Sequence, residues 1–368
     1  MAAPRTVLFA PDSFKGSLTS IEVARALAAG WARARPAHEL LLSPLADGGE
    51  GTLVAIEAAG GWTVETARVH DPLRREITAR WLRSADGRSA VVEMAEASGL
   101  SRVKPEERDP IAATSLGTGE LIRAAALAGA TRIVVGIGGS ATTDGGAGLL
   151  AGLCGLTDGL DLELLARVTG SLDVEVACDV SNPLLGPTGA AATYGPQKGA
   201  TPSDVETLEQ RLAVWAGELA AETGRDESGT PGAGAAGGVG FALLQIRDRC
   251  RSFALRPGVD LVMEATGFAE KLARADLVVT GEGRIDAQTA FGKTAWGVAR
   301  RAREAGTPCL AVGGGVTPDG IEALAAVGAI AVPVAEGPGT LEAAMAAGTA
   351  PIERCGERIA MLASILAP

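Results

Sequence analysis

Histidine, the side chain that most often serves as a general acid or base, is scarce: this chain has only two, His38 and His70. Both lie in segments that connect apolar runs. A zinc site built on histidine, or a Ser-His-Asp triad, would need at least one of them to be well placed, so both kinds of site are disfavoured. The chemistry is therefore expected to rest on carboxylates, lysines, hydroxyls and backbone amides.

Cysteine and long apolar runs are scarce as well. The five cysteines are an odd number, lie far apart and form no C-x-x-C pair. This pattern favours reduced thiols in a cytoplasmic protein over a disulfide scaffold. The first residues lack the pattern of a signal peptide, and no apolar run reaches the roughly 18 residues that a membrane span needs.

Aromatic residues make up only 3% of the chain, whereas glycine occurs 50 times. The core is therefore expected to consist of Ala, Leu and Val packed closely with glycine. Acidic residues outnumber basic ones by 44 to 33, which gives a net charge of −11. An acidic chain with few aromatics is poorly suited to bind nucleic acid and does not favour anionic membranes.

The order of the predicted elements indicates an α/β fold with two domains. A length of 368 residues suits two domains, and short apolar runs alternate with Ala-rich helices at both ends of the chain. In between, Thr63–His70, Ile77–Leu82 and Ala90–Met94 alternate apolar and polar residues, as antiparallel strands do. We predict a Rossmann-like doubly wound domain, residues 1–70 plus 270–368, interrupted by a second mixed α/β domain, residues 71–269.

Short apolar runs predict buried strands at Thr6–Ala10, Leu40–Leu42, Arg132–Gly136, Val174–Cys178, Leu277–Thr280, Cys309–Val312 and Ala329–Val332. Helices are predicted at Thr19–Ala34 and at Thr52–Ala59, the second ended by Gly60-Gly61.

Polar residues follow several of these strands. Ligands of open α/β sheets bind at the carboxyl ends of strands, so a shared ligand site is predicted there. Carboxylates at such a site can hold Mg²⁺ through water or accept a proton from a hydroxyl nucleophile. The carboxylates in this position are Asp12, Asp47, Asp179, Glu282 and Asp286, and other polar residues beside them are Ser13, Asn182 and Arg284.

Small residues gather between 138 and 146, directly after the predicted strand Arg132–Gly136. Exposed amides and hydroxyls in such a loop suit phosphate oxygens. The loop residues assigned to this role are Gly138, Gly139, Ser140, Thr142 and Gly145. A loose G-x-G-x-x-A match from Gly136 to Ala141 is discounted as a dinucleotide site, because residues 142–146 separate it from the next helix.

Lysine is rarer than arginine here, and three lysines lie beside glycine: Lys15, Lys198 and Lys293. Each could offset phosphate charge. Lys293-Thr294 resembles the end of a P-loop, but the position of that motif's first glycine holds Ala287, so it is not one. A Lys-Thr pair at a helix start can still meet a phosphate.

Seven segments together resemble the type 1 family of bacterial glycerate kinases, and they occur in the family's order over nearly the whole chain. These segments are Ala10–Leu18, Ala46–Thr52, Thr114–Glu120, Gly136–Gly148, Cys178–Leu184, Gly195–Ala200 and Gly281–Thr289. Two features depart from the family pattern: residues 153–172 form a short segment, and Ala295-Trp296 stands where the family usually has proline.

The resemblance implies that ATP, with Mg²⁺, phosphorylates D-glycerate in a cleft between the two domains, and it favours 2-phosphoglycerate over 3-phosphoglycerate. Asp179 or Asp286 is then expected to be the base, with Lys15 as a further catalytic residue. Asp12, Ser13, Asp47, Asn182 and Arg284 are assigned to substrate. The loop residues given above, Lys198 and Lys293 are assigned to the nucleotide, and Asp47 and Asp179 to the metal.

Two other functions stay open on sequence alone. One is an NAD(P)-dependent hydroxy-acid oxidoreductase, which the loose dinucleotide pattern would serve. The other is a non-catalytic sugar-acid-binding protein. Homo-oligomerisation is also open.

Overall fold

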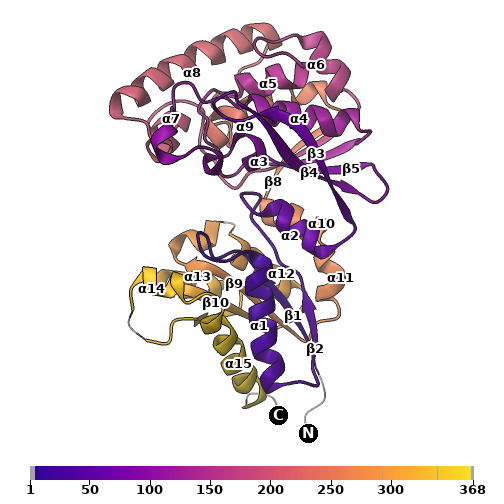
Figure 1. Cartoon of the computed structure of the whole chain (residues 1–368), viewed down its shortest axis with the longest axis vertical. Helices are drawn as coiled ribbons and strands as arrows, with labels where there is room; N and C mark the ends of the chain where they lie inside the picture. The colour runs from indigo at the N-terminus through magenta and orange to yellow at the C-terminus, as the bar shows by residue number, and fades with distance from the viewer. Residues whose placement is uncertain (1–4, 292, 338, 366–368) are drawn as a thin grey trace. The chain divides into compact units, whose positions relative to one another are not determined.

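The computed structural model describes residues 5–291, 293–337 and 339–365, and the chain divides into two compact units (Figure 1). The terminal unit holds the described residues of 1–47, 54–60 and 259–368, and the central unit holds residues 48–53 and 61–258. The division therefore lies N-terminal to the boundaries near 70 and 270 expected from the sequence. One reason is that β3 (Trp62–His70) pairs along its length with β4 (Glu76–Ser84) of the central unit.

The terminal unit is built on a parallel sheet of five strands in the order β11-β10-β9-β1-β2. The strands are β1 (Thr6–Pro11), β2 (Glu39–Leu42), β9 (Leu277–Ile285), β10 (Cys309–Val316) and β11 (Ala329–Pro333). Strand β9 runs five residues beyond the predicted end at Thr280, because Glu282, Arg284 and Ile285 pair with β10. Glu282 and Arg284 therefore lie on the strand and not in a turn after it.

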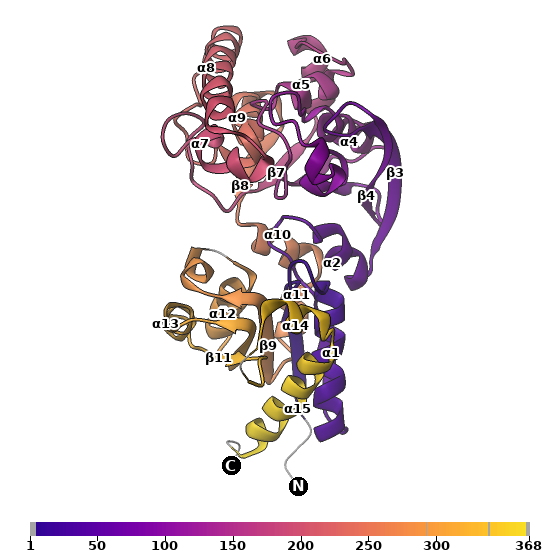
Figure 2. The ribbon, with the colours of Figure 1, turned by 60° about the vertical axis from the view of Figure 1, so that its left-hand side comes forward.

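Helices cover both faces of this sheet, as the doubly wound prediction requires. Alternate residues of a strand point to opposite faces, and Val7 and Phe9 pack with Leu27 and Ile352 of one helical layer. That layer consists of α1 (Ser20–Ala34) and α15 (Ala350–Ile365). The other face carries α12 (Thr294–Glu304), which contacts β1, β9 and β10, and α13 (Pro318–Ala326) packs beside it (Figure 2).

Local sequence signals explain where the helices of the terminal unit begin. Thr19 caps α1 with a capping box, in which its side chain accepts from the Glu22 amide and Glu22 binds back to Thr19. Helix α2 (Thr52–Ala59) has the predicted bounds. The remaining helices of the unit are α10 (Gly258–Ala265), α11 (Phe268–Leu272) and α14 (Leu341–Ala346).

The central unit has a mixed sheet of six strands in the order β3-β4-β5-β6-β7-β8. Strands β3, β4 and β5 (Ser89–Glu93) are antiparallel neighbours, as their alternating pattern predicted. From β5 onward the pairing is parallel, through β6 (Arg132–Gly136), β7 (Asp173–Ala177) and β8 (Ser252–Arg256). His70 thus ends a strand instead of lying on a connecting loop, and its ring Nδ1 lies 2.8 Å from Glu120 Oε1.

Seven α-helices are described in the central unit. They are α3 (Ala95–Ser98), α4 (Leu116–Leu127), α5 (Ala147–Cys154), α6 (Leu162–Thr169), α7 (Ala190–Tyr194), α8 (Pro202–Thr223) and α9 (Val239–Gln245). The short 153–172 segment thus accommodates α6, whose Asp161 cap accepts from the Glu163 and Leu164 amides. Apolar side chains of α4, α5 and α9 pack with those of the sheet into one core.

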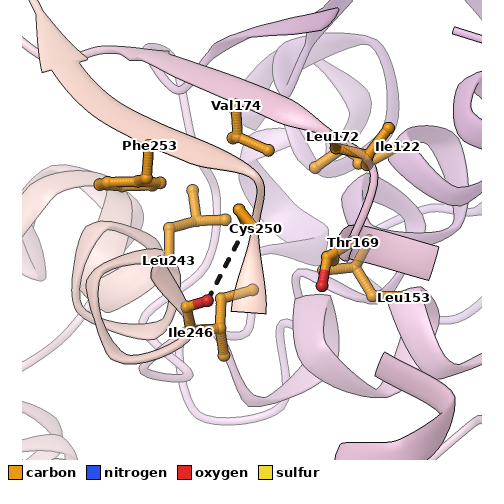
Figure 3. A pocket seen from close by; sticks show the side chains of 9 residues that line it. All are labelled: Ile122, Leu153, Thr169, Leu172, Val174, Leu243, Ile246, Cys250 and Phe253. Carbon is orange, nitrogen blue, oxygen red and sulfur yellow. Dashed lines mark hydrogen bonds between the residues drawn. The ribbon is translucent and has the colours of Figure 1, made fainter. Parts of the chain in front are cut away.

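A small pocket in this core is lined almost wholly by apolar side chains (Figure 3). Leu172, Val174 and Phe253 contribute from the sheet side, and Cys250 Sγ contacts the Ile246 carbonyl at 3.8 Å. The cavity volume of about 10 Å³ corresponds to roughly one water molecule. The pocket is therefore a packing gap and too small for an organic ligand.

All five cysteines are free, as the sequence predicted. Within the described ranges, the helices are all too short or too polar to cross a bilayer.

Candidate active site

Asp12 is a buried carboxylate at the carboxyl ends of the terminal sheet. It follows β1 directly and is 6% exposed. Its Oδ1 accepts a 2.6 Å hydrogen bond from the Ser13 amide, and its Oδ2 accepts one of 2.6 Å from Thr294 Oγ1 at the start of α12. The hydrogen bond from Thr294 connects the end of β1 to a helix that begins 282 positions later in the sequence.

The surroundings of Asp12 hold its pKa at about 6, well above the ordinary value near 3.8. Burial is the main cause, and the negative charge of Asp47 adds to it. The hydrogen bonds from Thr294 and Ser13, and the charge of Lys15, act in the opposite direction. Asp12 thus changes its protonation state much closer to neutral pH than an ordinary aspartate does.

Lys15 supplies a positive charge beside these two carboxylates. Its Nζ lies 3.5 Å from Asp47 Oδ2. The pKa of Lys15 is raised, chiefly by Asp47 and further by Asp12 and Glu282, although burial opposes the rise. The lysine side chain is 74% exposed, so its ammonium is open to solvent and to an anionic ligand.

Glu282 is a second buried carboxylate of this edge of the sheet. Its Oε1 accepts a 2.6 Å hydrogen bond from Thr289 Oγ1. Burial raises its pKa to about 7, and the charges of Asp12 and Asp286 also raise it, while Thr289 and Lys293 lower it. Two carboxyl groups with pKa values near neutral therefore lie at the carboxyl ends of one sheet.

Asp286 follows β9 and joins two cations. Its Oδ1 lies 3.3 Å from Lys293 Nζ, and its Oδ2 lies 3.2 Å from Arg284 Nε. Lys293 is the N-cap residue of α12, so the Lys-Thr pair does start a helix, as predicted. Arg284 is largely exposed. This arrangement presents two positive side chains next to the positive end of a helix dipole.

The carboxylates of the terminal unit fit a magnesium ion held mainly by water. Mg²⁺ commonly takes only one or two protein carboxylates and keeps water and phosphate oxygens for the rest. The repulsion between Asp47 and Asp12, which raises the pKa of Asp12, is what a cation beside them would relieve. Groups of three or more His, Cys, Asp or Glu side chains arranged to hold a metal do not occur among the described residues.

In the central unit, Asp144 occupies the middle of the Gly-rich loop and organises it. Its Oδ2 accepts from the Ser115 amide at 2.7 Å and from the Gly148 amide at 3.2 Å, and its Oδ1 accepts from the Gly146 amide at 3.1 Å. One carboxylate thereby satisfies amides at the starts of both α4 and α5. The Gly145 amide donates to the Gly237 carbonyl at 3.0 Å. The amides of Gly145, Gly146 and Gly148 in the second half of the loop thus already have hydrogen-bond acceptors within the protein.

The first half of the loop packs against neighbouring turns. The Gly138 amide donates to the Gly48 carbonyl at 3.4 Å, and the Gly139 carbonyl accepts from the Leu100 amide at 2.8 Å. Ser140 forms an isolated antiparallel bridge with Gly99.

Lys198 reaches this loop from the protein interior. It is 2% exposed, and its Nζ donates to the Thr142 carbonyl. Burial lowers its pKa to about 7, against the charge of Asp144, which raises it. In this structure the lysine therefore supports the loop and does not present its ammonium to solvent.

Asp179 and Asn182 follow β7, as predicted; Asp179 is exposed and Asn182 is half-buried. Asp179 Oδ1 accepts a 3.1 Å hydrogen bond from the Gly258 amide at the start of α10. The Asn182 side chain is engaged within its own loop: its Nδ2 donates to the Thr188 carbonyl at 2.7 Å, and its Oδ1 accepts from Tyr194 Oη at 2.8 Å.

Comparison with known proteins assigns the whole chain to one family. The model of the Glycerate kinase family matches residues 7–364. The chain belongs to the glycerate kinase family. A glycerate kinase of Halalkalibacterium halodurans is 43% identical over 84% of this chain and 85% of that protein. A glycerate 2-kinase of Escherichia coli K12 is 41% identical over 85% of this chain and 86% of its own length.

A solved structure agrees with this family assignment. It is a crystal structure from Salmonella typhimurium LT2 of a protein provisionally named glycerate kinase 2. It matches with a TM-score of 0.81 and 38% sequence identity, and the match covers 99% of each chain. The α/β fold with two units is thus the fold of a glycerate kinase family member.

In this glycerate kinase family member, the structure sorts the predicted site residues into two sets. The terminal unit brings together Asp12, Ser13, Lys15, Asp47, Arg284, Asp286 and Lys293. The central unit holds Gly138, Gly139, Ser140, Thr142, Gly145, Asp179, Asn182 and Lys198. The two residues assigned to the metal, Asp47 and Asp179, belong to different units.

Three features of this family member were not predicted from its sequence. Thr289 and Thr294 act as hydroxyl donors to buried carboxylates, and Asp144 acts as the centre of the Gly-rich loop. For Asp144 a signal was present, since an aspartate just before a helix start is a typical capping residue.

Proposed function

We propose that this protein transfers the γ-phosphoryl group of ATP to D-glycerate, and that 2-phosphoglycerate is the main product. The family match over residues 7–364 carries the proposal. The preference for the 2-position is supported by the Escherichia coli relative, which is named a glycerate 2-kinase and is 41% identical. We expect the reaction to take place in the cytoplasm, which suits five free thiols.

Phosphoryl transfer needs positioning and neutralisation of negative charge more than it needs covalent catalysis. Lys15, Lys293 and Arg284 are cations at the carboxyl end of the terminal sheet, and each lies within 3.5 Å of a carboxylate that orients it. Their ammonium and guanidinium groups suit the glycerate carboxylate and the oxygens of the transferred phosphoryl group. The loop residues Gly138, Gly139 and Ser140 are the proposed contacts of the nucleotide phosphates.

We propose Asp47 as a ligand of Mg²⁺, with Asp12 beside it and water and phosphate oxygens completing the shell. The ion would offset the charge of the phosphate groups. Asp179 stays a second candidate ligand. The charge of Asp47, which raises the pKa of Asp12, supports a cation at this place.

A carboxylate is the proposed acceptor of the proton that leaves the glycerate hydroxyl. Asp179 is the first candidate and Asp286 the second. An ordinary aspartate pKa is sufficient, because the proton leaves late, as charge moves onto the phosphate. The structure adds Asp12 as a competitor, since its pKa of about 6 lies closer to the working pH of a general base.

An ADP-release assay tests the proposed activity. Purified protein with ATP and Mg²⁺ is expected to release ADP with D-glycerate, and much less with L-glycerate, lactate or no acceptor. Omitting Mg²⁺ should abolish the release. If folded protein releases no ADP with D-glycerate, the proposed function is wrong.

A further inference from the structure

The segment 48–53 continues the chain directly after Asp47 and packs on the carboxyl ends of the central strands. Gly48 and Gly51 have φ angles of +84° and +95°, which side-chain-bearing residues rarely adopt. The Thr52 hydroxyl donates to the Gly49 carbonyl at 2.7 Å, which closes the turn at the start of α2. These two glycine conformations and this hydrogen bond define the path of the backbone through the turn.

Gly136, the last residue of β6, and Gly138, just after the strand, leave room for the turn because neither has a side chain. A Cβ atom on Gly136 would lie 2.6 Å from the Gly48 carbonyl oxygen, and one on Gly138 would lie 2.5 Å from Gly49 Cα. Distances this short are not tolerated between such atoms. The turn is thus in close backbone contact with the end of β6.

Glu93 holds the other side of the same turn. It is the last residue of β5, next to Gly136 in the register of the sheet, and is 3% exposed. Its Oε1 accepts a 3.0 Å hydrogen bond from the Gly51 amide, and its Oε2 accepts one of 2.9 Å from the Leu53 amide. A carboxylate from a distant strand therefore takes the place of a local cap at the start of α2.

We propose that Glu93 is a positioning residue of the phosphoryl-transfer reaction: it fixes the 48–53 turn and, through the chain, the neighbouring Asp47. The inference rests on the proposed function, because Asp47 is the proposed ligand of Mg²⁺ and contact of D-glycerate. It extends that proposal by a residue that touches neither substrate nor cofactor.

The chemistry of the contact supports a positioning role over simple core packing. Burying a carboxyl group is costly, and here burial raises the pKa of Glu93 to about 7, while Glu96 and Glu50 raise it further. The two amide hydrogen bonds lower it. An apolar residue would avoid this cost but would leave the half-buried Gly51 amide and the buried Leu53 amide without their acceptor. The carboxylate is the group that satisfies both amides at once.

Residue-resolved hydrogen exchange of the Gly51 and Leu53 amides measures the contact without reference to activity. In Glu93→Ala, both amides are expected to exchange at least about tenfold faster than in the wild type. Glu93→Gln keeps one acceptor oxygen and should protect these amides to an intermediate extent. Glu96→Gln, compared at pH 8, is the matched control. At this pH Glu93 is mostly ionised with or without the charge of Glu96. The variant removes a charge from a side chain that pairs with Arg80 and Arg102, and exchange at the turn should not change.

Kinetics then tests whether the turn matters for the reaction. At a temperature at which all variants are folded, Glu93→Ala should lower kcat/KM for D-glycerate by at least about tenfold. Glu93→Gln should recover part of the loss, and Glu96→Gln should match the wild type. Loss of global stability alone would not give this ordered change among variants that are all folded.

Each outcome decides the proposal. Unchanged amide exchange in folded Glu93→Gln and Glu93→Ala would show that Glu93 does not hold the turn. Faster exchange with unchanged kcat/KM would remove its role in the reaction. If the wild type itself releases no ADP with D-glycerate, the proposed function fails, and with it the catalytic part of this inference, whereas the exchange data still decide whether Glu93 fixes the turn.

Discussion

Thr294 Oγ1 donates a 2.6 Å hydrogen bond to Asp12 Oδ2, and the two residues are 282 positions apart in the sequence. The bond connects the end of β1 to the first residue of α12. Both side chains are buried. A buried carboxyl group depends strongly on its donors, so this contact fixes the edge of the sheet at which we place the reaction.

Replacing Thr294 by valine is expected to destabilise the protein by about 1–3 kcal/mol at pH 8, because a buried carboxylate loses its hydroxyl donor in a side chain of nearly the same shape. The pKa of Asp12 should rise above about 6, since the Thr294 hydrogen bond lowers it. Urea unfolding measures the stability. Thr294→Ser keeps the hydroxyl and serves as the control, so equal stability of the Val and Ser variants would contradict the prediction.

Glu282 should make the protein less stable as the pH rises. Its pKa is near 4.5 in an unfolded chain and about 7 in the folded one, so the folded state holds the extra proton between these values. The stabilisation that this proton on Glu282 gives the folded state is complete below about pH 4.5 and is lost as the pH rises through about 7. Glu282→Gln should therefore be more stable than the wild type at pH 8, by on the order of 3 kcal/mol, and nearly equal to it at pH 4.

Urea unfolding at the two pH values checks this prediction for Glu282. Glutamine retains an oxygen that can accept from Thr289, so the hydrogen bond is preserved while the titration is removed. A Glu282→Gln variant with the same dependence on pH as the wild type would contradict the raised pKa.

Lys198 should make the protein more stable as the pH rises, which is opposite to the effect of Glu282, and it should do so over a higher pH range. Its folded pKa of about 7 lies below the ordinary value of 10.5, so its contribution is complete above about pH 10.5 and is lost as the pH falls through about 7. Wild-type stability should thus gain a rising component between pH 7 and 10, which Lys198→Met should lack. Unfolding of both proteins at pH 7 and 9.5 measures the difference, and an unchanged rise in Lys198→Met would count against it.

Asp179→Asn should lower kcat by roughly a hundredfold or more if Asp179 accepts the glycerate proton. The fold should change little, because asparagine keeps an oxygen that can accept from the Gly258 amide. Steady-state kinetics with Asp286→Asn and Asp12→Asn in parallel identifies the base. A near-wild-type kcat for Asp179→Asn would exclude it and leave the other two.

Much of the fold could be predicted from periodicity. Apolar runs marked all five strands of the terminal sheet. Thr19 marked the start of α1, and Gly60 marked the end of α2. Strand β8 was missed, because Ser252–Arg256 is an edge strand whose polar ends hide its pattern. Helix α15 was missed as well, although its Gly and Ala residues suit close packing against α1.

The site was predicted less completely, for a physical reason. Strand ends mark which residues can meet a ligand, and this rule found Asp12, Asp47 and Asp286. It did not reveal pairings between distant residues, such as Asp12 with Thr294, because these depend on tertiary packing. It also did not reveal that Lys198 faces inward, since a lysine beside glycine looks the same in sequence whether its ammonium is buried or exposed. The cleft between the domains stays a prediction.

Phosphorus NMR of the reaction product shows whether D-glycerate is phosphorylated and on which hydroxyl. D-glycerate, ATP, Mg²⁺ and the protein are incubated, and the new phosphate ester signal is recorded with proton coupling. A phosphate on the C2 oxygen couples to a single carbon-bound proton and gives a doublet, whereas one on the C3 oxygen couples to two and gives a triplet. We predict a doublet that grows as ATP is consumed. A triplet would overturn the 2-phosphoglycerate assignment, and the absence of any new ester signal with folded protein would contradict glycerate phosphorylation itself.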